Sequence, residues 1–199
     1  LGDVYKRQII SFAMLLMCAT SSAQMKWNQS YQTYINQYKD LAIEQMLRYR
    51  IPASITLAQG LFESRAGQSD LVRQGNNHFG IKCHNWTGPT QYHDDDARGE
   101  CFRVYQDAKE SYEDHSRFLA KQPRYSRLFS LNTTDYKGWA HGLKSCGYAT
   151  NPQYANKLIQ IIELYRLQDY DKAKSYDRFM ATHSGTDVPI NCLLYTSPS

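Results

Sequence analysis

The sequence predicts an α+β fold that is mostly helical, with a small antiparallel β-hairpin lobe flanking a cleft. Apolar residues recur every three or four positions in the early and late parts of the 199-residue chain, which is typical of amphipathic helices. Between them, residues 81–105 contain aromatic residues, threonines and turn sequences, as short strands do. The length suits one domain with a substantial core.

Two helices separated by a proline open the predicted domain. Tyrosine and aliphatic side chains share one face over residues 31–49, which indicates a helix. Pro52 disfavours helical backbone at Ile51, so the first helix should end there. A second helix is expected over about residues 53–64, ending before Gly67.

A short helix after Ser69 should lead into the sheet, whose turns are indicated by "TGP" and "DDDARG". Three helices are predicted to follow. The last should start with Asn151 as its N-cap and Pro152 in its first turn. From Lys172 onward the apolar periodicity fades. The three helices are expected within residues 106–121, 135–146 and 151–167.

The ends of the chain are expected to lie outside the domain. Residues 9–23, "IISFAMLLMCATSSA", form an uncharged run that is too short to span a bilayer, and they end in small residues. This predicts a signal peptide and an exported protein, with no stable membrane insertion after cleavage. Cys18 is a poor lipidation site because the large Met17 precedes it. Residues 1–8 and 192–199 are interpreted as translated adapter sequence. The domain is expected to comprise residues 24–171, and residues 172–191 are expected to form a linker or tail.

Charge and cysteine content narrow the function classes. The net charge is only +4 and no Lys/Arg run is present, so a nucleic-acid partner is not expected. Export permits disulfides, and Cys83 and Cys101 flank the predicted hairpin, so they are the first candidate pair. Cys146 would then be free; the alternative is three reduced, buried cysteines. The cysteines and histidines show no common zinc spacing, so no metal or other cofactor is predicted.

Four blocks occur in a characteristic order over roughly residues 32–169: "LAQGLFES", "NNHFGIK", "FRVY" and "YATNPQYANKL". Their order and spacing resemble those of bacterial cell-wall glucosaminidases, the peptidoglycan-hydrolysing autolysins that include the flagellar rod-cap hydrolase domain. The resemblance implies a lysozyme-like fold and endo-cleavage of β-1,4 bonds at N-acetylglucosamine. It also implies peptidoglycan glycan strands as the partner of a monomeric enzyme that needs no cofactor.

The resemblance further implies that Glu63 is the general acid. Glu63 follows two apolar residues in the last turn of its predicted helix, where burial and the helix dipole would both raise the carboxyl pKa. Taken alone, the pattern favours a solvated surface glutamate, and the other three blocks reverse that preference. Arg65 departs from the family pattern, and a cation so close would favour ionised Glu63.

The second catalytic group is left open by the sequence. Gln91 in "TQY" stands where the flagellar relatives have an acid, and an amide cannot act as a base. Asp94 or Asp95 in "HDDDARGE" is the preferred replacement, and a carboxyl separation of roughly 6.5 to 9.5 Å from Glu63 would predict inversion. The acidic run could instead be a solvated turn with arginine partners. In a third scheme the substrate's own acetamido group attacks, and Tyr148 orients it.

Several residues of the matching blocks are candidates for substrate binding. An amide could hydrogen-bond the acetamido group, an aromatic ring could stack on a sugar, and a glycine could let backbone approach it. Trp139 is a further candidate sugar platform, although isolated tryptophans more often pack in cores. The substrate-binding candidates are Asn77, Phe79, Gly80, Trp86 and Tyr154.

Other functions fit the same features. A muramidase or a lytic transglycosylase would act on the same polymer, and the transglycosylase would need only one acid. A non-catalytic wall-binding domain could keep the cleft without the chemistry.

Overall fold

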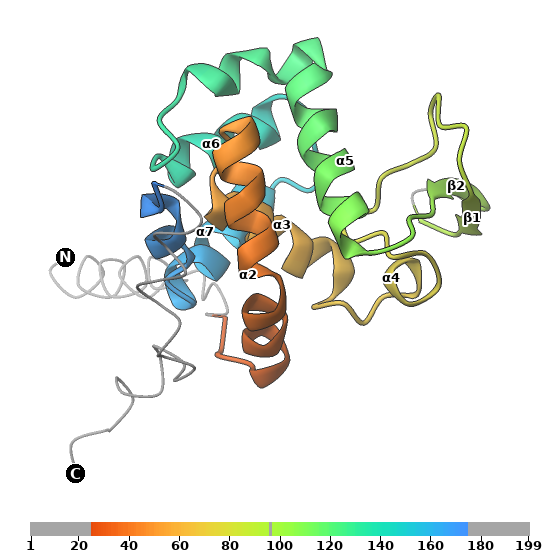
Figure 1. Ribbon diagram of the computed structural model, residues 1–199, viewed down its shortest axis with the longest axis horizontal. Coiled ribbons are helices and arrows are strands. Elements are labelled where there is room, and N and C mark those ends of the chain that lie inside the picture. The colour runs from red at the N-terminus through yellow and green to blue at the C-terminus, as the bar shows by residue number, and fades with distance from the viewer. Residues whose placement is uncertain (1–24, 96, 175–199) are drawn as a thin grey trace, which may run out of the picture.

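The computed structural model describes residues 25–95 and 97–174 and has the predicted α+β architecture (Figure 1). Helices pack around one another on one side, and a two-stranded sheet projects on the other. The predicted signal peptide, Cys18 and both terminal segments lie outside the described residues. Within these residues, no helix is long and apolar enough to cross a bilayer. The elements, in chain order, are α2 (Gln29–Tyr49), α3 (Ala53–Ser64), α4 (Asp70–Gly75), β1 (Thr90–His93), β2 (Glu100–Arg103), α5 (Ala108–Lys121), the 3-10 helix η1 (Pro123–Ser130), α6 (Tyr136–Ser145), α7 (Tyr154–Leu164) and the 3-10 helix η2 (Leu167–Lys172).

Helix α3 is the centre of the helical lobe. Every residue from Ala53 to Leu61 is buried, and the helix contacts α2, α6, α7 and η2. Pro52 precedes it as predicted, and Arg65 ends it in the left-handed conformation with φ 51°. A helix buried on all sides holds its end rigidly, so a side chain in its last turn has a fixed position.

The β lobe is small, and a disulfide together with backbone hydrogen bonds holds its segments to one another. Strands β1 and β2 pair antiparallel, with Gln91 opposite Phe102. Cys83 and Cys101 form a disulfide, which joins the loop before β1 to β2. Cys146 is the free cysteine among the described residues, as expected for that pairing.

Two local predictions are wrong. The last helix begins at Tyr154 with Gln153 at the N-cap position, so Asn151 does not cap it. Asn151 instead accepts a hydrogen bond from the Gln153 N–H, which forms a turn ahead of the helix. The two 3-10 helices were also not predicted, because their short apolar spacing follows neither the helical nor the strand period.

The second 3-10 helix anchors the start of α3. The Asp171 carboxylate accepts hydrogen bonds from the Ser54 N–H at 2.8 Å and the Ser54 hydroxyl at 2.6 Å. Pro52, at the N-cap position, makes no side-chain cap hydrogen bond. Asp171 therefore supplies the cap from more than one hundred residues away in the sequence.

Candidate active site

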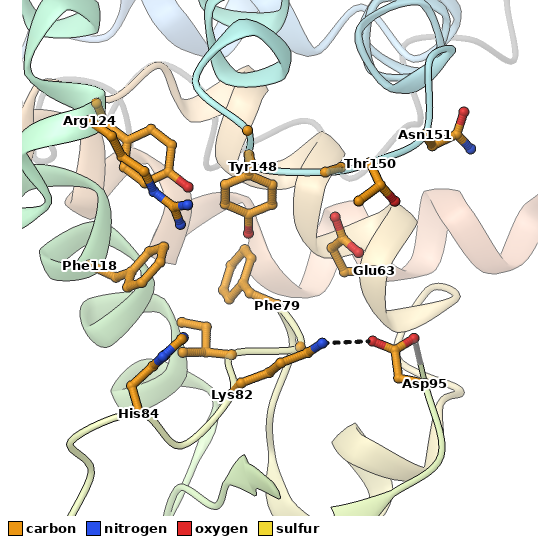
Figure 2. A pocket seen from close by; sticks show the side chains of 15 residues that line it. Glu63, Phe79, Lys82, His84, Asp95, Phe118, Arg124, Tyr148, Thr150 and Asn151 are labelled. Atoms are coloured by element: carbon orange, nitrogen blue, oxygen red, sulfur yellow. Dashed lines mark ion pairs between the residues drawn. The ribbon is translucent and has the colours of Figure 1, made fainter. Parts of the chain in front are cut away.

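A cleft of about 400 Å³ lies between the helical lobe and the β lobe (Figure 2). It is lined by the end of α3, the loop after Phe79, the β1–β2 turn, α5, η1 and the segment before α7. The residues that line it are Glu63, Phe79, Gly80, Ile81, Lys82, His84, Asp95, Phe118, Arg124, Tyr125, Gly147, Tyr148, Ala149, Thr150 and Asn151.

Glu63 faces this cleft from the last turn of α3, as the sequence predicted. Burial raises the pKa of its carboxyl to about 7, a hydrogen bond from Tyr154 opposes that rise, and the charge of Asp95 adds to it. Near neutral pH a substantial share of Glu63 is therefore protonated. A protonated carboxyl that opens onto a cleft can donate its proton to a bound oxygen.

Tyr154 holds this carboxyl in place and does not line the cleft. Its hydroxyl donates to Glu63 Oε1 at 3.1 Å and accepts a hydrogen bond from Gln59 Nε2 at 3.0 Å. The Tyr154 side chain is fully buried, so its predicted role as a substrate-binding residue is not what the structure shows. Gln59, one helical turn before Glu63, was not predicted as part of the site because it reaches Glu63 only through this long-range partner.

Tyr148 lies in the cleft between Glu63 and the aromatic end (Figure 2). Its ring stacks on Tyr154, with the centroids 5.7 Å apart and the planes at 25°. Burial and the nearby Glu63 charge hold the pKa of the Tyr148 hydroxyl well above its usual range. The hydroxyl therefore stays protonated and is available as a hydrogen-bond donor or acceptor to a ligand.

Arg65 does not act on Glu63 as the sequence suggested. It is exposed at the C-cap of α3, and the structure records no ion pair between the two side chains. The left-handed backbone at Arg65 turns the chain away after Ser64. The expected stabilisation of ionised Glu63 by this cation is therefore not found.

The acidic turn separates the two predicted aspartates. Asp95 lines the cleft, and its Oδ2 lies 3.7 Å from Lys82 Nζ (Figure 2). Asp94 Oδ1 accepts a hydrogen bond from the Gly99 N–H at 2.7 Å and so closes the hairpin turn. Of these two carboxylates, only Asp95 belongs to the cleft.

The "NNHFGIK" block contributes to the cleft through Phe79 and Gly80. Phe79 lines the cleft with its edge while its ring stacks on His115 at 3.9 Å. Gly80 has φ 60°, and a Cβ there would meet nothing within 4 Å. The left-handed backbone therefore favours glycine here, and the approach of this backbone to a sugar stays a prediction.

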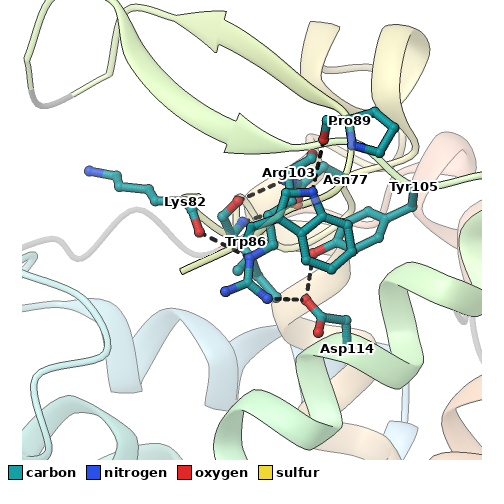
Figure 3. Close-up of polar contacts among 8 residues, drawn as sticks. Asn77, Lys82, Trp86, Pro89, Arg103, Tyr105 and Asp114 are labelled. Carbon is teal, nitrogen blue, oxygen red and sulfur yellow. Dashed lines mark hydrogen bonds and ion pairs between the residues drawn. The ribbon is translucent and has the colours of Figure 1, made fainter. Parts of the chain in front are cut away.

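Asn77 is not a substrate ligand in this structure. It is 1% exposed, and its amide donates to the carbonyls of Ile81 and Arg103 while its oxygen accepts from the Ile81 N–H. The bond to Arg103 joins the loop after α4 to β2 (Figure 3), and the two bonds with Ile81 stabilise that loop internally. The predicted contact with an acetamido group is wrong because these backbone groups already use the side chain.

The tryptophans are not sugar platforms either. Trp86 packs beneath the Arg103 guanidinium and against Tyr105, and its indole N–H donates to the Pro89 carbonyl (Figure 3). Trp139 is fully buried against Phe129. Both rings therefore pack against neighbouring side chains and stabilise the fold.

Gln91 also lies away from the cleft. Its amide donates to the Leu71 carbonyl at 3.0 Å, which links β1 to α4. The position is therefore structural here, in agreement with the loss of an acid at that point of the family pattern.

The sequence missed several residues that line the cleft. Lys82 lies beside Asp95, and His84, Phe118, Arg124 and Tyr125 line the end of the cleft away from Glu63, although none of the five was predicted there. Phe118 could have been identified only as one residue of an amphipathic helix, because its place in the cleft depends on how α5 packs. Among the described residues, no group of three His, Cys, Asp or Glu side chains could hold a metal ion.

This arrangement has the elements of a glycosidase: a proton-bearing glutamate and an aspartate in a cleft between a helical lobe and a small β lobe. Comparison with known proteins identifies the family to which this domain belongs. The model of the glucosaminidase family, described as mannosyl-glycoprotein endo-beta-N-acetylglucosaminidase, matches residues 39–167. The chain belongs to the glucosaminidase family.

Characterised relatives are similar over the same region. The exo-glucosaminidase LytG of Bacillus subtilis is 35% identical over 136 residues, which cover 63% of this chain and 48% of LytG. The peptidoglycan hydrolase FlgJ of Salmonella typhimurium is 32% identical over 139 residues, covering 63% of this chain and 43% of FlgJ. The chain thus spans less than half the length of these two curated relatives.

Solved structures share the lysozyme-like fold. The catalytic domain of the autolysin Auto from Listeria monocytogenes superposes with a TM-score of 0.61 at 29% identity, covering 82% of this chain and 96% of that domain. The glycoside hydrolase domain of Salmonella typhimurium FlgJ gives a TM-score of 0.58 at 26% identity, covering 76% of this chain and 98% of that domain. The described chain is therefore a glycoside hydrolase domain of this class.

Proposed function

We propose that this protein is an exported peptidoglycan hydrolase that cleaves β-1,4 glycosidic bonds at N-acetylglucosamine, with Glu63 as the general acid. The observation that carries the proposal is the Glu63 carboxyl, which burial gives a pKa of about 7, at the wall of a cleft open to a polymer. The names of its relatives LytG and FlgJ support the glucosaminidase reaction and the peptidoglycan substrate. The predicted signal peptide supports export.

In the proposed mechanism, Glu63 gives its proton to the glycosidic oxygen as the bond breaks, and Asp95 accepts a proton from the water that attacks the anomeric carbon. The products are two shorter glycans, and the water supplies the new hydroxyl of one and the proton lost by Glu63. Asp95 is supported in this role because it lines the same cleft and its charge acts on Glu63. Tyr148 is proposed to orient the acetamido group near the reacting carbon.

The enzyme is proposed to be a monomer and to cleave internal bonds of the glycan strands. Among the described residues, the large exposed apolar side chains are Trp27, Leu47 and Tyr92, which lie before α2, in α2 and in β1. The family description names endo-cleavage, whereas the relative LytG is named an exo-glucosaminidase. The length distribution of early products separates these two modes: endo-cleavage shortens the strands throughout, and exo-cleavage releases terminal units.

The test is a zymogram on peptidoglycan with wild type, Glu63→Gln and the matched surface variant Glu44→Gln. Wild type and Glu44→Gln should clear the gel, and Glu63→Gln should not. Mass spectrometry of the digest should find reducing-end N-acetylglucosamine. Anhydro-muramic products would instead indicate a lytic transglycosylase, and an unchanged band for Glu63→Gln would show that Glu63 is not the acid.

A further inference from the structure

The two ends of the cleft differ in chemistry. Glu63 and Asp95 occupy one end, and Phe118, Arg124 and His84 occupy the other, with Phe79 and Tyr148 between them (Figure 2). The reacting carbon would lie at the carboxylate end under the proposed function. The aromatic and basic end is therefore placed to contact a sugar or substituent away from the cleaved bond.

Arg124 provides a positive charge at the aromatic and basic end of the cleft that forms no ion pair among the described residues. Its guanidinium lies over the Tyr125 ring at 4.6 Å and over the Phe118 ring at 5.8 Å, so two aromatic faces hold it in position. The side chain is exposed, and no carboxylate of the described residues pairs with it. The other strongly basic side chain of the cleft differs, because Lys82 pairs with Glu100 at 2.7 Å and with Asp95 at 3.7 Å.

The surroundings of Arg124 suit an anion attached to an apolar or sugar surface. Tyr125 is fully buried, and its ring lies beneath the guanidinium. The rings of His84 and Phe118 lie nearly parallel, with centroids 6.5 Å apart and planes at 20°. A guanidinium prefers planar oxyanions such as carboxylates, and aromatic rings contact the C–H faces of sugars and alkyl groups.

We propose that Arg124 binds a carboxylate of the muramyl part of the substrate, so that the far end of the cleft distinguishes acidic wall glycan from uncharged N-acetylglucosamine oligomers. This assignment rests on the proposed function for the identity of the glycan. Two groups of that polymer carry the required chemistry. One is the lactyl carboxylate of a muramic residue without its peptide, and the other is a carboxylate of the peptide stem.

The test measures binding without turnover, in proteins that all carry Glu63→Gln. The ligands are three glycans of matched length: a neutral N-acetylglucosamine oligomer, a wall glycan stripped of peptides, and a wall glycan with stems intact. Arg124→Gln should bind one of the two acidic glycans about tenfold more weakly and the neutral oligomer unchanged, because a charge-assisted contact is lost. The effect should shrink as salt rises.

The matched control is Arg127→Gln, which removes an equal charge from the same 3-10 helix. Arg127 does not line the cleft, and its Nε lies 3.2 Å from the Cys146 sulfur, so binding of all three glycans should stay as before. Arg124→Lys keeps the charge without the planar fork and should fall between wild type and Arg124→Gln. Thermal melting establishes that each variant is folded.

The outcomes are distinct. A loss confined to the stripped glycan assigns the lactyl carboxylate, and a loss confined to the intact glycan assigns the stem; both support the proposal. Equal affinities of Arg124→Gln and its parent, or an equal loss on the neutral oligomer, overturn it. Failure of the wild-type enzyme to cleave wall glycan would count against the proposed function, while the binding comparison would still decide the role of Arg124.

Discussion

Tyr154 donates a hydrogen bond to Glu63 Oε1 at 3.1 Å, and Gln59 donates one to the same Tyr154 hydroxyl at 3.0 Å. Because Gln59 Nε2 can only donate, the Tyr154 hydroxyl accepts from it and keeps its own hydrogen for Glu63 Oε1. Oε1 is thereby engaged as an acceptor, and the acidic proton of Glu63 belongs on its other oxygen. Gln59 and Tyr154 thus orient the proton that the proposed reaction uses.

The first prediction concerns pH and Tyr154→Phe. The raised pKa of Glu63, about 7, means that the acid form is present below that pH, so activity should fall as pH rises through about 7. The Tyr154 hydrogen bond lowers this pKa, so its removal should raise it and move the fall in kcat/KM to higher pH. Tyr136→Phe, which alters a surface hydroxyl bonded to Glu163, is the control and should leave the profile in place. A downward shift for Tyr154→Phe would contradict this account.

The second prediction concerns Asp95→Asn. If Asp95 activates water, kcat should fall by about 10²- to 10⁴-fold. The wild-type enzyme should first release the inverted anomer, which NMR of fresh products detects. Asp94→Asn is the control, because Asp94 closes the turn and lies outside the cleft lining, and it should retain most activity.

The Asp95 variant has a second readout. The Asp95 charge raises the pKa of Glu63, so Asp95→Asn should shift the residual pH profile downward. A retained anomer together with an active Asp95→Asn enzyme would instead favour attack by the acetamido group, with Tyr148 as its positioning residue.

The third prediction concerns the cap that Asp171 places on α3. Asp171→Ala should lower the free energy of unfolding by about 2 kcal/mol, because two buried donors of Ser54 lose their acceptor. Urea denaturation measures the change. Asp169→Ala removes a more exposed carboxylate that pairs with Arg166 and Lys172, and it should cost about 1 kcal/mol or less. Similar losses in both variants would show that Asp171 is not a specific cap.

The fourth prediction concerns the disulfide. Cys83 and Cys101 are 18 residues apart, so Cys83→Ser should lower the free energy of unfolding by about 3 kcal/mol through the freedom it returns to the unfolded chain. Cys146→Ser changes the free cysteine and should have a small effect. Thermal melting with and without a reductant checks both: reductant should lower the Tm of Cys146→Ser and leave that of Cys83→Ser unchanged.

The elements whose signals are local were predicted well. Pro52 marks the start of α3 and the glycine after Ser64 lies just past its end, so its bounds agree with the prediction. The ordered sequence blocks, rather than the position of Glu63 in the last turn, made this residue the candidate acid. A helix was predicted in the α7 region, but α7 starts two residues later than predicted, because a turn stabilised by Asn151 competes with helix initiation.

Which residues surround Glu63 could not be predicted from the sequence, because contacts between distant segments decide it. Asn77 and Trp86 have side chains that commonly bind sugars. In this structure the Asn77 amide is hydrogen-bonded to backbone carbonyls, and the Trp86 ring packs against the Arg103 guanidinium of β2. The choice between Asp94 and Asp95 followed from one hydrogen bond across the turn.

The sequence by itself determined the helical order and the family, and it singled out Glu63 as the candidate acid, because periodicity, caps and short motifs act over neighbouring residues. The tertiary structure decided which polar side chains reach the cleft. Tyr154 lies 91 positions from Glu63 in the sequence and contacts it only in the folded chain. Arg124 lines the cleft only because η1 packs against α5. Burial and hydrogen-bond partners are properties of the packed chain, so the pKa of Glu63 and the character of the far end of the cleft arise only on folding.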